Sequence, residues 1–197
     1  MSHTATPTVV DKKQQLVSAA FQLFYQRGVH QVGINEVLSA AGVAKKTLYH
    51  HFPAKQELLL AVLEQRATAW LDWMAGCLSQ VQQGAPALQV FFLALHDWFA
   101  GEVPQLHSFH GCFFTKVALE VQDPAVQARC QQFRLDLAAL LMPHLQCCWP
   151  QEQQASAKLA MLLLLKDGAE TEAALNADPT AAMRALSLWQ LAARHPA

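Results

Sequence analysis

Hydrogen-bond donors are concentrated in one short segment near the N-terminus. The segment contains Lys45, Lys46, Thr47, Tyr49, His50 and His51. It follows Gly42, and glycine is the residue that most easily adopts the positive φ of a sharp turn. Ammonium, hydroxyl and imidazole groups donate to phosphate oxygens and to the edges of bases. This spacing therefore predicts a short helix that enters the major groove of double-stranded DNA.

Two short helices must hold these donors in place. The first is expected to begin after Gly33, with Glu36 in its first turn, and to end at Gly42. The second is expected over residues 45–51, stopped by Pro53. Its apolar neighbours Leu48 and Phe52 are expected in the core, and Tyr49 and His51 have packing as an alternative.

The segment AGVAKKTLYHHFPAKQELLLAVL, residues 41–63, resembles the signature of TetR/AcrR-type transcriptional regulators. At the level of motifs the resemblance covers about residues 11–65. It implies that Lys45, Lys46 and Thr47 reach bases and nearby phosphates. It further implies that Tyr49 and His50 contact phosphates or a thymine methyl, and that Lys55 holds a backbone phosphate.

The segment departs from the family pattern at three positions. Ala44 and Ala54 stand where the family usually has serine or another capping residue, and each absence removes about 0.5–2 kcal/mol of capping energy. Lys46 replaces a usual small residue, which adds charge to the helix expected to contact DNA.

Helical periodicity continues through the rest of the chain, so we expect an all-α fold of about nine helices. The expected helices are about 11–27, 34–41, 45–51, 55–82, 86–100, 112–121, 124–146, 151–174 and 179–194. We expect a flexible N-terminal arm at 1–10, a helix-turn-helix DNA-binding domain at 11–54, and a helical effector-binding and dimerisation domain at 55–197.

Charge separates the two expected domains. Residues 1–55 carry six basic and two acidic groups, a net charge of +4, whereas residues 56–197 carry eight basic and thirteen acidic groups, a net charge of −5. A basic N-terminal region on an acidic body suits a protein with one DNA-facing end. No apolar run is long enough for a bilayer, and the polar N-terminus lacks a signal-peptide core, so we expect a soluble, cytoplasmic protein without a membrane partner.

The last two expected helices are candidates for a homodimer contact. The run from Leu159 to Leu165 is apolar nearly all round, which indicates burial on several sides. The residues predicted at the contact are Leu162, Leu165, Leu186 and Trp189. The resemblance implies a four-helix bundle formed by two subunits, and an entirely intramolecular core is the alternative.

The middle helices carry many aromatic residues, which could line an apolar pocket with a few polar groups. The residues predicted to line an effector pocket are Trp70, Trp73, Phe92, His96, Cys112 and Lys116. The resemblance implies an unidentified small molecule that binds there, changes the separation of the two DNA-binding ends, and releases a repressor from a palindromic operator. For each polar candidate, a structural or solvated role is the alternative.

Cysteines suggest a further possibility. The segment GCFFTKVALE, residues 111–120, resembles a branch of the family with members that respond to electrophiles or oxidants through cysteine. A helix N-terminus, Lys116 and His110 are each expected to lower the pKa of Cys112, and a buried, inert thiol is the alternative. The odd count of five cysteines argues against a disulfide framework.

Enzyme and metal chemistry find little support. The spacing of His107, His110 and Cys112 could suit a metal, but no fourth ligand is evident, so no metal site is predicted. No nucleophile triad, paired carboxylates or phosphate-binding loop is recognisable, and no cofactor or catalytic residue is predicted. A helical ligand carrier or enzyme, or a partner-binding adaptor, remains the alternative to a DNA-binding regulator.

Overall fold

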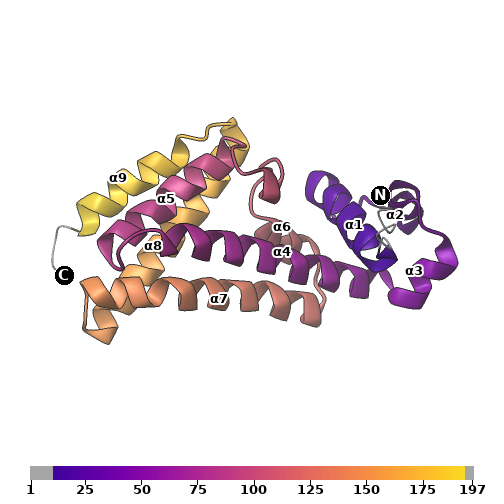
Figure 1. The fold of residues 1–197 in the computed structure, drawn as a ribbon, viewed down its shortest axis with the longest axis horizontal. Coiled ribbons are helices and arrows are strands. Elements are labelled where there is room, and N and C mark those ends of the chain that lie inside the picture. The colour runs from indigo at the N-terminus through magenta and orange to yellow at the C-terminus, as the bar shows by residue number, and fades with distance from the viewer. Residues whose placement is uncertain (1–10, 194–197) are drawn as a thin grey trace, which may run out of the picture.

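The computed structural model describes residues 11–193, and all regular structure within them is helical, which confirms the all-α prediction (Figure 1). The nine α-helices of this range are α1 (Lys12–Arg27), α2 (Ile34–Ala41), α3 (Lys45–His51), α4 (Lys55–Ser79), α5 (Ala85–Phe99), α6 (Phe113–Glu120), α7 (Pro124–Cys148), α8 (Glu152–Asn176) and α9 (Ala181–Ala193). The predicted arm at 1–10 lies outside the described residues.

Helices α1, α2 and α3 form a small bundle at one end of the molecule, which we call the head (Figure 1). Asp11 caps α1 by accepting a hydrogen bond from the Lys13 backbone N–H at 2.9 Å. Gly42 ends α2 in the left-handed conformation, with φ of 61° and ψ of 35°, as the turn requires. The core of the head is apolar and includes Leu16, Ala20, Phe24, Val37 and Leu48.

Helices α4 to α9 form the body. Helix α4 leaves the head and runs alongside α7, while α5, α8 and α9 pack together at the far end (Figure 1). No helix in residues 11–193 has the length and apolar character that crossing a membrane requires.

The structure corrects the predicted dimer residues. Leu162, Leu186 and Trp189 are only 0%, 5% and 4% exposed, so they fill the core of the protomer and cannot reach a second copy. Leu165 is half-buried. The periodicity of α8 correctly indicated burial on several sides, but α5, α7 and α9 supply most of its neighbours within the same chain.

Two local predictions also change. Asp178–Pro179 does not open α9, which begins at Ala181. Instead the Asp178 carboxylate accepts hydrogen bonds from the backbone N–H and hydroxyl of Thr180 and from Arg184. A short 3₁₀ helix, Pro104–Leu106, forms between the helices expected over residues 86–100 and 112–121.

Candidate DNA interface and effector cavity

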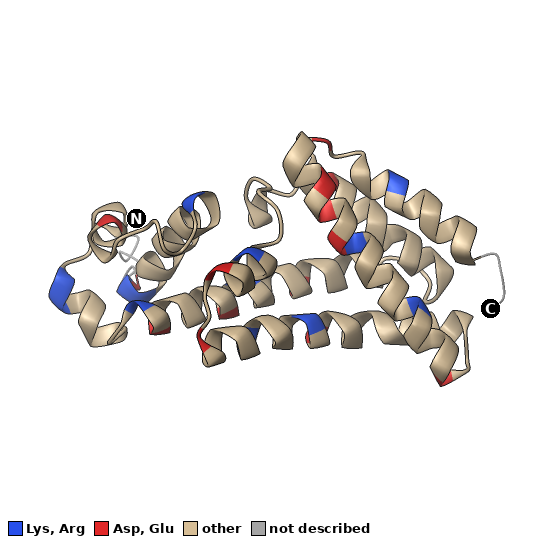
Figure 2. Cartoon of the chain, turned by 180° about the vertical axis from the view of Figure 1, so that it is seen from behind, with Lys and Arg blue, Asp and Glu red and all other residues tan. Residues whose placement is uncertain are grey.

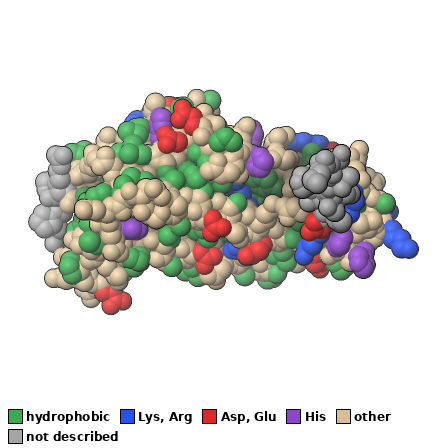
Figure 3. All heavy atoms as spheres, viewed as in Figure 1, with side chains coloured by type: hydrophobic (Ala, Val, Ile, Leu, Met, Phe, Trp, Pro, Cys, Tyr) green, Lys and Arg blue, Asp and Glu red, His purple; other side chains and the backbone are tan. Residues whose placement is uncertain are grey.

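Helix α3 presents polar side chains on an apolar base. Lys45, Lys46, Tyr49 and His50 are exposed, and Thr47 is half-buried. Leu48 and Phe52, at 0% and 3% exposure, anchor the helix in the core of the head. Basic and histidine side chains gather at this end of the surface (Figure 3). The polar side chains of α3 that are predicted to contact DNA are therefore accessible, and the helix that carries them is anchored in the core of the head.

An ion pair joins α1 to α2 in the head. The Glu36 carboxylate accepts from the Gly33 backbone N–H at 3.0 Å and from Arg27 at 2.5 Å. These two contacts, the backbone N–H first, lower the pKa of Glu36. On α3 itself, the Lys45 ammonium lies 5.9 Å from the centre of the Tyr49 ring, which keeps both side chains on one face.

Lys55 lies in a different environment from the α3 lysines. Its ammonium donates to the Val29 carbonyl at 2.5 Å and lies 5.6 Å from the centre of the Phe24 ring. Partial burial lowers the pKa of Lys55. The side chain thus fastens the start of α4 to the loop after α1, and only the N–H donors that this bond leaves over are available to a phosphate.

Helix α6 is bonded directly to the head. The Tyr25 hydroxyl donates to the Gly111 carbonyl at 2.7 Å, and the Lys116 ammonium donates to the Tyr25 carbonyl at 2.9 Å. At the other end of α6, the Glu120 carboxylate accepts from the backbone N–H groups of Val29, at 2.9 Å, and His30. Motion of α6 must therefore strain or move the end of α1.

Gly28 makes the Glu120 contact possible. Its φ is +88°, which side chains rarely adopt, and a Cβ there would lie 3.2 Å from a Glu120 carboxylate oxygen. Sequence reasoning did not assign a junction to Tyr25, Gly28 or Glu120, because these contacts join residues 86 to 91 positions apart.

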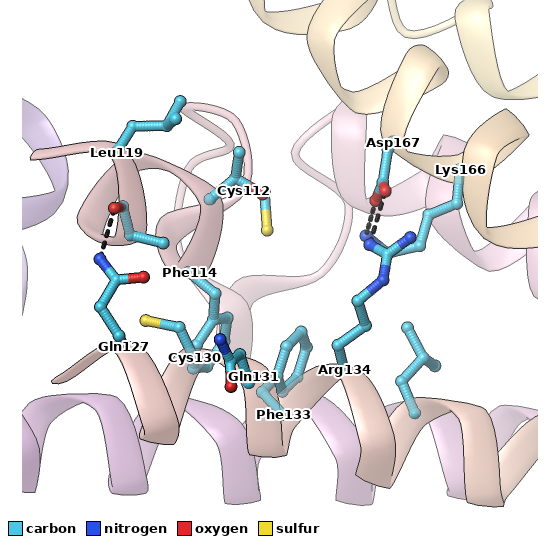
Figure 4. A pocket seen from close by; sticks show the side chains of 13 residues that line it. Cys112, Phe114, Leu119, Gln127, Cys130, Gln131, Phe133, Arg134, Lys166 and Asp167 are labelled. Carbon is cyan, nitrogen blue, oxygen red and sulfur yellow. Dashed lines mark hydrogen bonds and ion pairs between the residues drawn. The ribbon is translucent and has the colours of Figure 1, made fainter. Parts of the chain in front are cut away.

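The face of α6 that does not contact the head borders a cavity of about 330 Å³, between α6, α7 and α8 (Figure 4). Its lining side chains are Cys112, Phe114, Thr115, Ala118, Leu119, Gln127, Cys130, Gln131, Phe133, Arg134, Leu137, Lys166 and Asp167. The stacked rings of Phe114 and Phe133, with centres 3.8 Å apart, give it an aromatic wall. One helix therefore contacts both the cavity and the head.

Charged groups lie at the α8 side of the cavity. Lys166 and Glu170, each 3% exposed, pair at 2.7 Å, and Arg134 bonds Asp167 at 2.6 Å. Burial by itself would lower the pKa of Lys166, but the charges of Glu170 and Asp167 outweigh it and raise that pKa. Lys166 is consequently held in its charged form.

Comparisons with known proteins agree with this architecture. The family model described as bacterial regulatory proteins, tetR family, matches residues 16–62, which span most of the head and the start of α4. The crystal structure of a TetR-family transcriptional regulator from Streptomyces coelicolor matches with a TM-score of 0.82 and 25% identity, over 96% of this chain and 90% of that one. Residues 16–62 therefore resemble the TetR family in sequence, and the chain as a whole has the fold of a TetR-family regulator.

Curated relatives in the family match mainly at the head. The transcriptional activator FasR of Mycolicibacterium smegmatis is 46% identical over 55 residues, 28% of this chain and 25% of its own length. The transcriptional regulator RutR of Escherichia coli K12 is 40% identical over 60 residues, 30% of this chain and 28% of its own length. The matched region thus spans about a quarter of each relative.

The structure revises the predicted effector residues. Of those residues, only Cys112 lines the α6–α7–α8 cavity, and Lys116 borders two neighbouring hollows. Trp70 and Phe92 are buried in the core, and Trp73 packs edge-on against Trp70.

His96 also lies apart from the cavity. Its ring lies 3.4 Å from Asp97 and does not contribute to the lining. Aromatic content alone did not distinguish core from cavity, because packing decides which faces remain uncovered.

The expectation of a low thiol pKa at Cys112 is wrong. Desolvation of the thiol, and then the negative charge of Glu170, raise the pKa of Cys112. The sequence placed Lys116 one turn away, but its ammonium is bonded to the Tyr25 and His110 carbonyls. Within the described residues, no cluster of three or more potential metal ligands occurs.

Proposed function

We propose that this chain regulates transcription by binding a palindromic DNA operator as a homodimer, and that a small effector releases it. The supporting observation is the exposed polar face of α3 on its buried apolar base. In this proposal Lys45, Lys46 and Thr47 contact bases and adjacent phosphates, and Tyr49 and His50 contact the backbone.

The proposed dimer uses the outer faces of α8 and α9. Between residues 156 and 171, the exposed positions of α8 are all uncharged: Ser156, Ala157, Ala160, Leu164, Gly168 and Thr171. Leu164 is 68% exposed, and Leu188 and Leu191 on α9 are 55% and 59% exposed. Small residues between leucines allow two helices to approach closely, and such a face favours a second copy over solvent.

The proposed route from effector to DNA passes through α6. A molecule in the cavity contacts the α6 side chains Phe114, Thr115 and Ala118. Any shift of α6 acts on the head through the bonds of Tyr25 and Glu120. Effector binding then changes the separation of the two α3 helices, and this alters operator affinity by population shift.

Selection of bound duplexes from a random pool tests DNA recognition. We expect an enriched palindrome, bound more tightly than random duplex in fluorescence anisotropy. Lys45→Ala should weaken the selected duplex more than random duplex, whereas Arg129→Ala, a control on α7 of the body, should leave both affinities unchanged. An unenriched pool contradicts specific binding, and equal losses with Lys45→Ala exclude that residue from base recognition.

Light scattering after size exclusion tests the dimer. We expect a dimer that Leu164→Glu and Leu188→Glu convert to a monomer, since each places a charge in the apolar contact. Leu135→Glu is the matched control, because Leu135 is 62% exposed on α7, away from this face. A monomeric parent protein, or a dimer that tolerates both changes, removes α8 and α9 from the proposal.

A further inference from the structure

An ion pair divides two hollows of the body. Arg134 reaches from α7 to Asp167 on α8 (Figure 4). On one side lies the 330 Å³ cavity with the aromatic wall, and on the other a hollow of about 430 Å³ lined in part by Glu170 and Thr171. Both hollows are bordered by Arg134 and Asp167. This pair is therefore a charged group that a molecule in either hollow can contact.

The two partners differ in their remaining hydrogen-bonding capacity. Both carboxylate oxygens of Asp167 are occupied, one by Arg134 at 2.6 Å and one by Lys166 at 3.2 Å. A guanidinium has five N–H donors, and among the described residues Arg134 uses its donors only on Asp167. Arg134 therefore has N–H donors that are not used on Asp167, and these suit a ligand that accepts hydrogen bonds.

Charge disfavours a cationic ligand. Lys166 remains protonated beside Asp167, and its other carboxylate partner, Glu170, is 3% exposed and bonded to it. A ligand cation would lie near two fixed cations and find each nearby carboxylate already paired. A ligand anion can instead take the place of Asp167, whose side chain is 34% exposed and can turn to solvent. That exchange leaves the local charge balance unchanged if the ligand carries one negative charge.

Much of the remaining lining is apolar, although Thr115, Gln127 and Gln131 also border the cavity. Phe114, Phe133 and Leu137 are buried in its wall, and Leu119 at its edge is 78% exposed. An exposed leucine beside an aromatic wall is apolar surface that the apolar part of a ligand can cover. At about 30 Å³ for a water-sized group, 330 Å³ admits about ten heavy atoms.

We propose that this cavity binds a small organic monocarboxylate, with its headgroup on Arg134 in place of Asp167 and its apolar body along Phe114, Phe133 and Leu119. The inference deepens the proposed effector role and rests on it only for the consequence for DNA. Binding of the carboxylate itself is measurable without DNA.

Titration calorimetry with octanoate, 1-octanol and octylamine tests the class of ligand. The three probes share a chain length and differ in charge. We expect octanoate to bind at least about tenfold more tightly than octanol, and octylamine most weakly, because a carboxylate forms charge-assisted hydrogen bonds with a guanidinium. Absence of octanoate binding, or equal or tighter binding of octylamine, overturns the proposal.

Arg134→Met identifies the headgroup site. We expect this variant to remove the advantage of octanoate over octanol while the octanol affinity stays the same. Arg129→Met is the matched control, since Arg129 lies on the same helix, pairs with Glu64 and does not line the cavity. Circular dichroism verifies that both variants fold. An octanoate advantage that persists in Arg134→Met contradicts the assigned headgroup position.

Operator binding with and without octanoate separates this inference from the proposed function. If octanoate binds as expected but operator affinity is unchanged, the carboxylate site stands and the effector role fails. If the protein binds its operator but not octanoate, the carboxylate inference fails and DNA recognition stands.

Discussion

The head and the body place their charges differently. Lys, Arg, Asp and Glu occur in both the head and the body (Figure 2). In the head, Lys45 and Lys46 are exposed, and the Arg27–Glu36 pair is nearly half exposed. The charged residues buried within the described chain all belong to the body, namely Arg66, Lys166 and Glu170. Charges at a surface are free to meet a partner, whereas buried charges must already have one. The exposed charges of the head are therefore available to a polyanion, whereas the buried charges of the body organise its own interior.

Arg66 illustrates the internal use of charge. It lies on α4, is 5% exposed, and donates to the Leu106 carbonyl at 3.0 Å. Its guanidinium also lies 5.1 to 5.6 Å from the ring centres of Phe21, Tyr25 and Trp98. Two of these rings belong to α1, so a buried cation of the body helps to hold the head.

Removing one partner of the buried pair should give the largest effect on stability. Lys166→Met leaves Glu170 buried without a counter-charge, which costs about 3–5 kcal/mol in the free energy of unfolding. Arg27→Met, in the exposed pair of the head, should cost less than about 1 kcal/mol. Urea denaturation measures both, and the double variant Lys166→Met/Glu170→Leu should recover most of the loss. Similar losses for the two single variants would remove the distinction between head and body.

The junction between the two regions should show an intermediate effect. Glu120→Gln replaces a carboxylate that accepts from two backbone N–H groups, and should lower the free energy of unfolding by about 1–2 kcal/mol. Glu64→Gln, in a pair where the carboxylate side chain is 66% exposed, is the control and should change stability by about 0.5 kcal/mol or less. Urea denaturation is again the measurement, and equal effects would contradict a special role for Glu120.

Two lysines near the head should respond in opposite ways. Lys46→Ala should leave stability unchanged and lower the slope of log affinity against log salt by about one unit, as expected for a phosphate contact. Lys55→Ala should lower the free energy of unfolding by about 1 kcal/mol and leave the slope unchanged, because its ammonium is bonded to Val29. A lower slope for Lys55→Ala would restore its predicted phosphate contact.

The smallest expected effect concerns pH and the turn before α9. Hydrogen bonds from Thr180, and then from Arg184, lower the pKa of Asp178 from 3.8 to about 2. A lowered folded-state pKa contributes stability above the unfolded value, and that contribution is lost as pH falls from about 4 to 2. Asp178→Asn should therefore reduce the fall in melting temperature between pH 5 and pH 2. An unchanged curve would contradict this contribution.

Local sequence determined the head. Gly42, the donors of α3 and the apolar Leu48 and Phe52 lie within about ten residues of one another, so turn geometry and helical periodicity were sufficient to place them. The family signature and the basic N-terminal charge lie in the same region. The helical class of the body also followed from periodicity, since every long segment repeats apolar residues at helical spacing.

The roles of the body residues depend on contacts between helices that are distant in the chain. Trp70, Phe92 and Leu162 share the apolar chemistry of the side chains that border the cavity or the outer face, and packing between distant helices determines which are covered. Glu120 bonds a loop 91 residues earlier in the chain, and Arg134 meets Asp167 across two helices. Periodicity tells which side of a helix is apolar, but it does not tell which other helix covers that side.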